Sequence, residues 1–210
     1  MYPIYENYSS KFLKFAAKAI LSPALFFLAA KEYNKQYITA YFAQIRRVFD
    51  MVTGKLIAGN GDLSEVMDIR IKVFVDEQGF PLEEEKDEYD VRAVHALLYD
   101  DQHEPAATGR LFIDNDGYWR LGRIAVLKEK RGQQLGDLVM RMLLDKAIGV
   151  GAQHFRLSSQ KQVEGFYALY GFTPYGEEYM DHHVPHVEME ATLESVVRAV
   201  FSGCRGADFV

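Results

Sequence analysis

Residues 124–144, which read IAVLKEKRGQQLGDLVMRMLL, have the types and spacing needed to bind an anion. An apolar strand runs into a basic loop, and the loop opens an amphipathic helix. Backbone N–H groups in a first helical turn are unpaired and lie at the positive end of the helix dipole, and glycine permits close approach to the backbone. Gly132 and Gly136, with the charges of Arg131 and Lys130, therefore predict an anion site here.

A second stretch, GFYALYGF at 165–172, places Tyr167 in a short helix that ends at Gly171 before another strand. A tyrosine, with an ordinary pKa near ~10, can give a proton to a leaving group. Phe166 and Tyr170 flank Tyr167 at helical spacing, so a place in the aromatic core is the other interpretation of this residue.

The elements that must position these residues follow from the hydrophobic pattern. Short strand-like runs alternate with helical ones from residue 54 onward, as in a mixed α/β layer. Strands are predicted at 55–58, 94–99, 106–113, 118–126, 154–158, 172–175 and 186–193. Helices are predicted at 62–75, 135–148, 163–170 and 194–201.

Residues 1–53 have a different hydrophobic pattern, which predicts a helical hairpin in front of a domain at 54–210. Apolar residues recur at helical spacing over 9–21, and Ser22-Pro23 starts a second helix. Its apolar stripe needs a partner, which is the neighbouring helix, the following domain, or a second copy of the chain in a homodimer. The alternative, less favoured, is peripheral contact with a membrane through Lys11, Lys14, Lys18 and the following apolar segment.

Charge and cysteine content narrow the classes of function. The net charge of the 210 residues is −6, but the first 50 residues hold seven Lys/Arg against three Asp/Glu, which leaves the rest at −10. So acidic a domain would repel a phosphate backbone, which argues against nucleic acid as a partner. Cys204 is the only cysteine, so no internal disulfide forms and a reducing cytoplasm is expected. The longest uncharged apolar run, 19–30, falls short of the roughly 20 residues that span a bilayer.

The order and spacing of these segments resemble the GNAT acetyltransferase superfamily, and within it a branch of small bacterial N-acetyltransferases. That superfamily has a pyrophosphate-binding loop of the form Q/R-x-x-G-x-G/A, and RGQQLG at 131–136 matches it at Arg131 and Gly136, while Gln134 replaces the middle glycine. The resemblance covers about residues 55–193. It also rests on RIKVFVDEQGFP (70–81), DEYDVRAVHALLYD (87–100), TGRLFID (108–114), GFYALYGF (165–172) and VPHVEM (184–189).

The resemblance implies a GNAT-like α+β fold, with a mixed, mostly antiparallel sheet flanked by helices, and transfer of an acetyl group from acetyl-CoA to the primary amine of a small molecule or peptide. It implies that a backbone N–H on the strand at 124–126 stabilises the oxyanion, and that Tyr167 protonates the leaving thiolate. The implied cofactor-binding residues are Ile124, Ala125, Val126, Arg131, Gly132, Gln133, Gln134, Leu135, Gly136, Asp137, Ser159 and Phe166.

The general base is left open by the sequence, with Glu83, Glu84, Glu85 and Asp87 as candidates in an acidic run that otherwise predicts a solvated face. Asp181, His182, His183, His186 and Glu188 have the types of metal ligands. Because Pro185 breaks the helix that would align them, no metal is expected, and His186 is placed beside the acceptor pocket.

Two other functions compete with this interpretation. The elements R-x-x-V-F at 70–74 and D-x-x-D-x-x-A at 87–93 also resemble acyl-homoserine lactone synthases, a related fold that takes acyl groups from a carrier protein. The loop at 131–136 favours coenzyme A instead. Because Gln134 departs from the loop pattern, a non-catalytic module that senses acyl-CoA is the second alternative.

Overall fold

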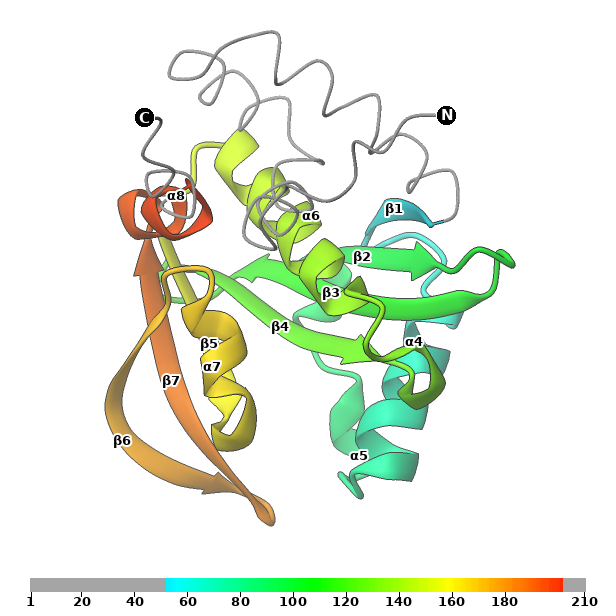
Figure 1. The fold of residues 1–210 in the computed structure, drawn as a ribbon. Helices are drawn as coiled ribbons and strands as arrows, with labels where there is room; N and C mark the ends of the chain where they lie inside the picture. The colour runs from blue at the N-terminus through cyan, green and yellow to red at the C-terminus, as the bar shows by residue number, and fades with distance from the viewer. Residues whose placement is uncertain (1–51, 202–210) are drawn as a thin grey trace, which may run out of the picture.

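One mixed sheet organises the computed structural model, which describes residues 52–201 (Figure 1). Its seven strands lie in the order β1-β2-β3-β4-β5-β7-β6, and every neighbouring pair is antiparallel except β4 and β5. The strands are β1 (Thr53–Ala58), β2 (Val94–Tyr99), β3 (Pro105–Ile113), β4 (Trp119–Val126), β5 (His154–Gln160), β6 (Thr173–Asp181) and β7 (Val184–Thr192).

The helices pack on both faces of this sheet. They are α4 (Ser64–Arg70), which continues as the π-helix η1 (Ile71–Glu77), then α5 (Leu82–Glu85), α6 (Leu135–Gly149), α7 (Glu164–Ala168) and α8 (Leu193–Phe201). Short 3-10 turns lie at η2 (Asp90–Arg92), η3 (Lys128–Lys130) and η4 (Lys161–Val163). None of the helices within residues 52–201 is long and apolar enough to cross a membrane.

The alternation of side chains along the strands gives the sheet two apolar faces. On β2, Ala96 and Leu98 belong to the cluster that packs against α6, while Leu97 belongs to the cluster around Val66 and Ile69 of α4. Burial on both faces explains why consecutive residues of β2 and β3 are buried, rather than every second one.

Helix α6 lies close against the sheet because β3 carries a glycine beneath it. A Cβ on Gly109 would come within 2.5 Å of Val139 Cγ1 and 2.6 Å of Ile124 Cδ1. The helix ends at Gly149, and Gly151 at φ +91° takes the left-handed conformation that closes its last turn. This packing fixes the start of α6 beside the end of β4.

Most of the predicted elements are confirmed, including the strand at 94–99 and the helix that begins at Leu135. The predicted helix over 62–75 is confirmed by α4 and η1, and it changes from an α-helix to a π-helix at Ile71. The predicted strand at 172–175 is longer than expected and continues to Asp181 as β6. The α+β class with a mostly antiparallel sheet is confirmed.

The predicted helical hairpin falls on residues that the structure does not describe, up to residue 51, and it stays a prediction. Its last residue, Thr53, begins β1 and pairs with Tyr99 of β2. Cys204 also lies outside the described residues.

Candidate active site

The two parallel strands of the sheet separate along their length. Only Trp119 with Phe155 and Arg120 with Arg156 are paired between β4 and β5. Beyond these pairs the facing edges of both strands have no strand partner, and Figure 1 shows β4 and β5 diverging. An unpaired edge presents N–H and C=O groups that an extended chain with amides can pair. The facing edges of β4 and β5 therefore present such groups.

A bulge in β4 accompanies this separation. Gly122 faces Arg110 and Ala125 faces Thr108, so β4 carries one more residue than β3 over the same step. The extra residue is Arg123, whose φ of +53° is left-handed. A bulge bends its strand and reverses which residues face each side. As a result, Ile124 and Val126 pack toward the α6 face, and Ala125 packs toward the α4 face.

The loop after β4 leads directly into α6. Gly132 and Gln134 are both left-handed, at φ +80° and +62°, and Gln134 is the N-cap of α6. The backbone N–H groups from Gly132 to Asp137 find no acceptor among residues 52–201. Nothing lies within 4 Å of a Cβ built on Gly132, so the loop is open at this point. Free donors at a helix start fit a diphosphate.

The side-chain cations of the loop are engaged elsewhere. Arg131 makes two hydrogen bonds to Glu77 of η1, at 2.7 and 2.6 Å, and a third to the Val126 carbonyl at 3.2 Å. This pairing holds the pKa of the Glu77 carboxyl below its ordinary value. Lys130 lies 2.5 Å from Asp100. In this arrangement the backbone of the loop, rather than its arginine, offers the free donors.

Helix α7 packs against the start of α6. A Cβ on Gly136 would lie 3.6 Å from Val126 Cγ2 and 3.7 Å from Phe166 Cζ, so these three residues meet. The Tyr170 hydroxyl donates to Asp137, which also accepts two hydrogen bonds from Arg141. These contacts bring together the end of β4, the first turn of α6 and the aromatic residues in and just after α7.

Tyr167 lies within this junction. It is 9% exposed, its ring is 5.1 Å from that of Phe166, and its hydroxyl finds no hydrogen-bond partner among the described residues. Burial raises the pKa of Tyr167 to about 12, so its phenol stays protonated in neutral solution. Tyr167 thus combines both interpretations of the sequence, since it packs in the core and retains an unused donor.

Ser159 lies on the helix-facing side of β5. It is fully buried, and its hydroxyl donates to the Gln160 carbonyl at 2.9 Å. Its neighbours in sequence, Ser158 and Gln160, point to the opposite face of the sheet, where they pair with Glu188 and His186 of β7. A contact of Ser159 with a pantetheine arm stays a prediction.

The prediction of a solvated acidic face over residues 83–90 is wrong for Glu85 and Asp90, which are 4% and 1% exposed. They belong to a buried ion network between α4, the acidic run and the sheet. Its members are Arg70, Glu85, Asp87, Asp90, Arg110 and Arg123. Burial disfavours ionised Asp90, yet hydrogen bonds and charges from Arg70 and Arg110 outweigh it and hold its pKa well below the ordinary range.

This network removes most of the expected general bases. Asp87 receives two hydrogen bonds from Arg110, at 2.6 and 2.8 Å, and Glu85 receives one from Arg70 at 2.5 Å. Glu84 lies 2.8 Å from His182. Carboxylates held as partners of cations are poorly placed to take a proton from a substrate. Of the four candidates only Glu83 has no hydrogen bond or ion pair among the described residues.

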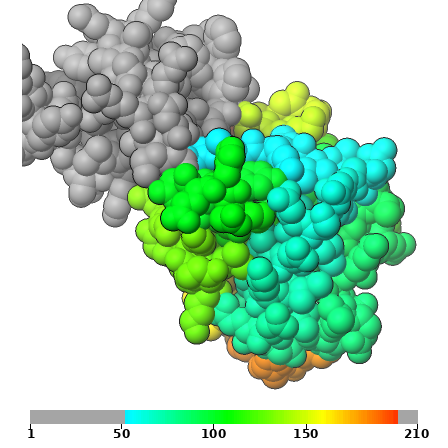
Figure 2. Space-filling model, turned by 90° about the vertical axis from the view of Figure 1, so that its right-hand side faces the viewer, coloured from blue at the N-terminus to red at the C-terminus, as the bar shows by residue number. Residues whose placement is uncertain are grey.

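The sheet face opposite α6 and α7 is covered by a bridge between two segments. His183 Nε2 donates to the Gln78 carbonyl at 2.8 Å, and Gln160 donates to the Gln78 side chain at 2.7 Å. The ring of Phe80 lies 5.5 Å from that of His183 and 6.4 Å from that of His186. Figure 2 shows the β6–β7 hairpin (orange) emerging beneath the η1–α5 segment (teal). The bridge covers the end of β5, where β5 has separated from β4.

Polar side chains line the same face below this bridge. Glu188 accepts hydrogen bonds from Arg120 and from the Tyr179 hydroxyl at 3.1 Å, and the Tyr179 hydroxyl lies 2.5 Å from Ser158 Oγ. Burial raises the pKa of Tyr179, so it remains a phenol. Sequence reasoning missed Ser158, Tyr179 and Arg120, because only strand pairing reveals that they share a face.

The described residues contain no group of three or more His, Cys, Asp or Glu side chains placed to hold a metal ion. The histidines of the β6–β7 turn have other contacts instead. His182 pairs with Glu84, and the pKa of His182 is raised by that hydrogen bond.

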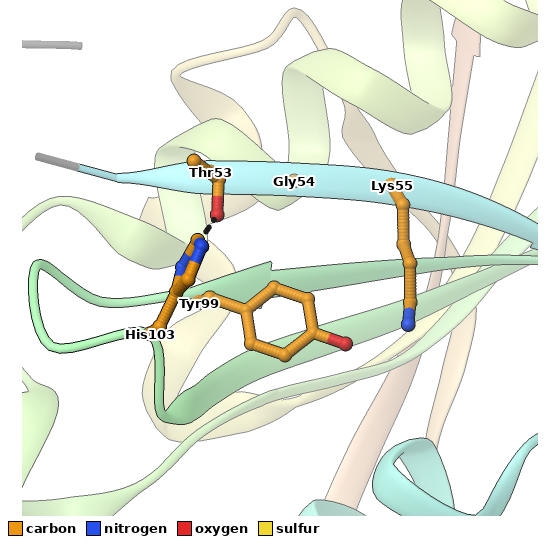
Figure 3. A pocket seen from close by; sticks show the side chains of 5 residues that line it. All are labelled: Thr53, Gly54, Lys55, Tyr99 and His103. Carbon is orange, nitrogen blue, oxygen red and sulfur yellow. Dashed lines mark hydrogen bonds between the residues drawn. The ribbon is translucent and has the colours of Figure 1, made fainter. Parts of the chain in front are cut away.

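A separate pocket lies at the far edge of the sheet. It is lined by Thr53, Gly54, Lys55, Tyr99 and His103, and Figure 3 shows the Thr53 hydroxyl directed at the His103 ring, 3.4 Å from Nδ1. Strands β1 and β2 carry most of this lining, whereas the separated strands are β4 and β5. This pocket is therefore distinct from the gap between β4 and β5.

Comparison with known proteins agrees with this geometry. Residues 63–193 match the family model of the acetyltransferase (GNAT) domain. The chain is 38% identical over 136 residues to the uncharacterised N-acetyltransferase YjcF of Bacillus subtilis, covering 64% of this chain and 96% of that one. A crystal structure of an acyl-CoA N-acyltransferase from Pseudomonas aeruginosa superposes with a TM-score of 0.61 at 26% identity, covering 67% of this chain and 99% of that one. Escherichia coli ElaA superposes with the same TM-score of 0.61 at 25% identity and the same coverage of 67% and 99%.

The matched region includes the separated strands, the open loop and the helix that follows it. The chain therefore belongs to the GNAT acetyltransferase family.

Proposed function

We propose that this protein transfers the acetyl group of acetyl-CoA to the primary amine of a small molecule or peptide, by direct attack within a ternary complex. The separation of β4 from β5, next to a loop whose N–H groups from Gly132 to Asp137 are free, carries the proposal. The strand edges suit the amides of pantetheine, and the loop suits the diphosphate. Both halves of coenzyme A thus find complementary groups.

The oxyanion of the tetrahedral intermediate would be stabilised from β4. The bulge at Arg123 turns the backbone of Ile124 to Val126 just where β4 has lost its partner on the β5 side. A backbone N–H fixed in place before the reaction costs no reorganisation when charge develops on the thioester oxygen. Removing one such donor in other enzymes slows the reaction by about 10²–10³-fold.

Tyr167 would supply the proton that the leaving thiolate needs. Its hydroxyl is unpaired among the described residues, and its pKa, raised by burial to about 12, keeps the proton on the oxygen until sulfur becomes basic. As the C–N bond forms and the C–S bond breaks, the phenolic proton passes to sulfur. The phenolate then regains a proton from solvent or from the new amide nitrogen.

Thiol release from acetyl-CoA in the presence of a panel of amines tests this function. The panel holds aminosugars, polyamines, amino acids and lysine peptides, and mass spectrometry identifies an N-acetylated product. We expect at least one amine to give turnover well above that with water. Tight binding of acetyl-CoA without turnover on any amine would favour the acyl-CoA-sensing module instead. Turnover only with an acyl carrier protein would favour the acyl-homoserine lactone synthase class.

The expected setting belongs to the same proposal. A coenzyme A user with one cysteine and an acidic domain fits the cytoplasm and a partner other than nucleic acid. A homodimer through residues 1–53 remains our proposal for the role of that extension, and sedimentation of the full chain against a chain that begins at residue 52 tests it.

A further inference from the structure

We propose that His186 is the group that takes the proton from the acceptor ammonium, which makes it a catalytic residue of the proposed reaction. This inference rests on the proposed function, because only an amine acceptor needs such a base. An alkylammonium has an ordinary pKa near ~10.4 and no lone pair, so attack requires that it first lose a proton.

The hydrogen bonding of the His186 ring fixes which nitrogen carries its proton. Nδ1 lies 3.0 Å from the Val184 carbonyl oxygen. A carbonyl can only accept, so Nδ1 must donate, and in the neutral ring Nε2 then carries the lone pair. The backbone of the β6–β7 turn therefore holds the ring in the tautomer that a base requires.

The other nitrogen is free to act. His186 is only 7% exposed, yet Nε2 has no partner among residues 52–201 and is not one of the polar atoms buried without a partner. Nε2 therefore touches accessible space. The ring is fixed by stacking on Tyr179, at 5.9 Å and 27°, and by the edge of Phe80. A buried ring that is held in one orientation and has one accessible, unpaired nitrogen is better suited to proton transfer than to a purely structural role.

Its position in the sheet places His186 one strand away from the gap between β4 and β5. His186 pairs with Gln160, the last residue of β5, where β5 no longer touches β4. The side chains of His186 and Gln160 point away from α6 and α7, toward the face of the sheet that Phe80 covers. A strand spacing of about 4.8 Å separates β7 from β5, so an imidazole on β7 reaches the gap directly or across one water.

The remaining titratable groups on this face, apart from the exposed Glu83 of α5, are engaged with partners. On β7 and β6, Glu188 is paired with Arg120 and accepts from Tyr179, whose pKa burial raises. On the turn, His182 pairs with Glu84 of α5, and His183 donates to the Gln78 carbonyl. Beside the end of β5, Lys161 pairs with Glu178 of β6. His186 is thus the titratable residue of this face, within the described part of the chain, that keeps an unused and sheltered lone pair.

The kinetic test compares His186→Gln with His154→Gln in the full-length protein. His154 is the matched control, because it is a histidine of the same strand pair, but it is exposed and lies opposite Thr192 at the other end of β5. For an alkylamine acceptor we expect His186→Gln to lower kcat/KM by roughly 10²–10³-fold, with the KM for acetyl-CoA unchanged. The pH profile of this variant should lose the wild-type limb and rise steadily with hydroxide. His154→Gln should stay within about threefold of wild type.

Weakly basic acceptors separate a proton-transfer role from a structural one. A hydrazide or an aromatic amine is already neutral at the assay pH, so it needs no base before attack, and we expect His186→Gln to slow it by less than about fivefold. An equal loss for both acceptor types, with an unchanged pH profile, would assign His186 to packing and overturn the proposal.

A measurement that needs no turnover tests the tautomer itself. In a 15N-labelled protein, two-bond proton–nitrogen correlations should show the His186 ring protonated at Nδ1, and a ring protonated at Nε2 would overturn the proposal. A wild-type protein that binds acetyl-CoA and acetylates no amine would contradict the proposed function, and the base assignment with it. Turnover of an alkylamine at the wild-type rate in His186→Gln contradicts the base assignment alone.

Discussion

Replacing Gln134 by glycine should stabilise the protein, because this residue is held in a conformation that side chains avoid. Gln134 caps α6 at φ +62° and ψ +16°, where a Cβ costs roughly 1–2 kcal/mol. Glycine removes that cost, but it also raises the conformational entropy of the unfolded chain, which lowers the free energy of unfolding by about 0.4–1 kcal/mol. The exposed Gln134 side chain makes no hydrogen bond among the described residues, so little else is lost. The net expectation is an increase of about 0.5–1 kcal/mol in the free energy of unfolding.

The neighbouring residue provides the control. Gln133 is equally exposed but has no positive φ, so Gln133→Gly should lower the free energy of unfolding by about 0.4–1 kcal/mol. Urea unfolding followed by circular dichroism measures both variants, and Gln134→Gly should also raise Tm by about 1–4 °C. If both glycine variants lose stability to the same extent, the left-handed cap is not strained and the account of Gln134 is refuted.

Two further predictions concern the ion network and the proton donor. Asp90→Asn should lower the free energy of unfolding by about 3–5 kcal/mol, because it removes a negative charge that pairs with the buried Arg70 and Arg110. Because the pKa of Asp90 is lower in the folded state, its contribution to stability is complete above the ordinary aspartate pKa and is lost as the pH falls below it. The free energy of unfolding of Asp90→Asn, measured with urea, should therefore fall less steeply at acid pH than that of the wild type. An unchanged dependence on pH would contradict this. Tyr167→Phe should lower kcat at least tenfold and leave the Kd for coenzyme A within about twofold, and equal losses in both would assign Tyr167 to packing.

The sequence reveals those parts of the fold that depend on local pattern. The strand at 94–99 and the start of α6 at Leu135 follow from apolar runs and glycine-containing turns. The π-helix at Ile71–Glu77 could not be predicted, because its hydrogen bonds change while its apolar spacing still looks helical. The bulge at Arg123 is similarly hidden, since it exists only in the register between β4 and β3.

The candidate site divides in the same way. The loop from Arg131 to Gly136 is contiguous, so its free N–H groups could be predicted from residue types and their order. The acidic run could not be placed correctly, because the arginines that bury Glu85 and Asp90 come from elements before and after it. The proposed role of His186 depends on one carbonyl contact and one strand pair, which only the folded chain brings together.

Calorimetric titration of the full-length protein with coenzyme A tests the central claim that the free amides at the start of α6 bind its diphosphate. The matched variants are Gly136→Glu and Gly149→Glu, since both glycines lie in α6 with room for a Cβ and only the first adjoins the loop. We expect saturable binding to the wild type and to Gly149→Glu, and none to Gly136→Glu, because its carboxylate repels the phosphates. Absence of heat from folded wild type at millimolar coenzyme A, or unaltered binding by Gly136→Glu, would contradict the claim.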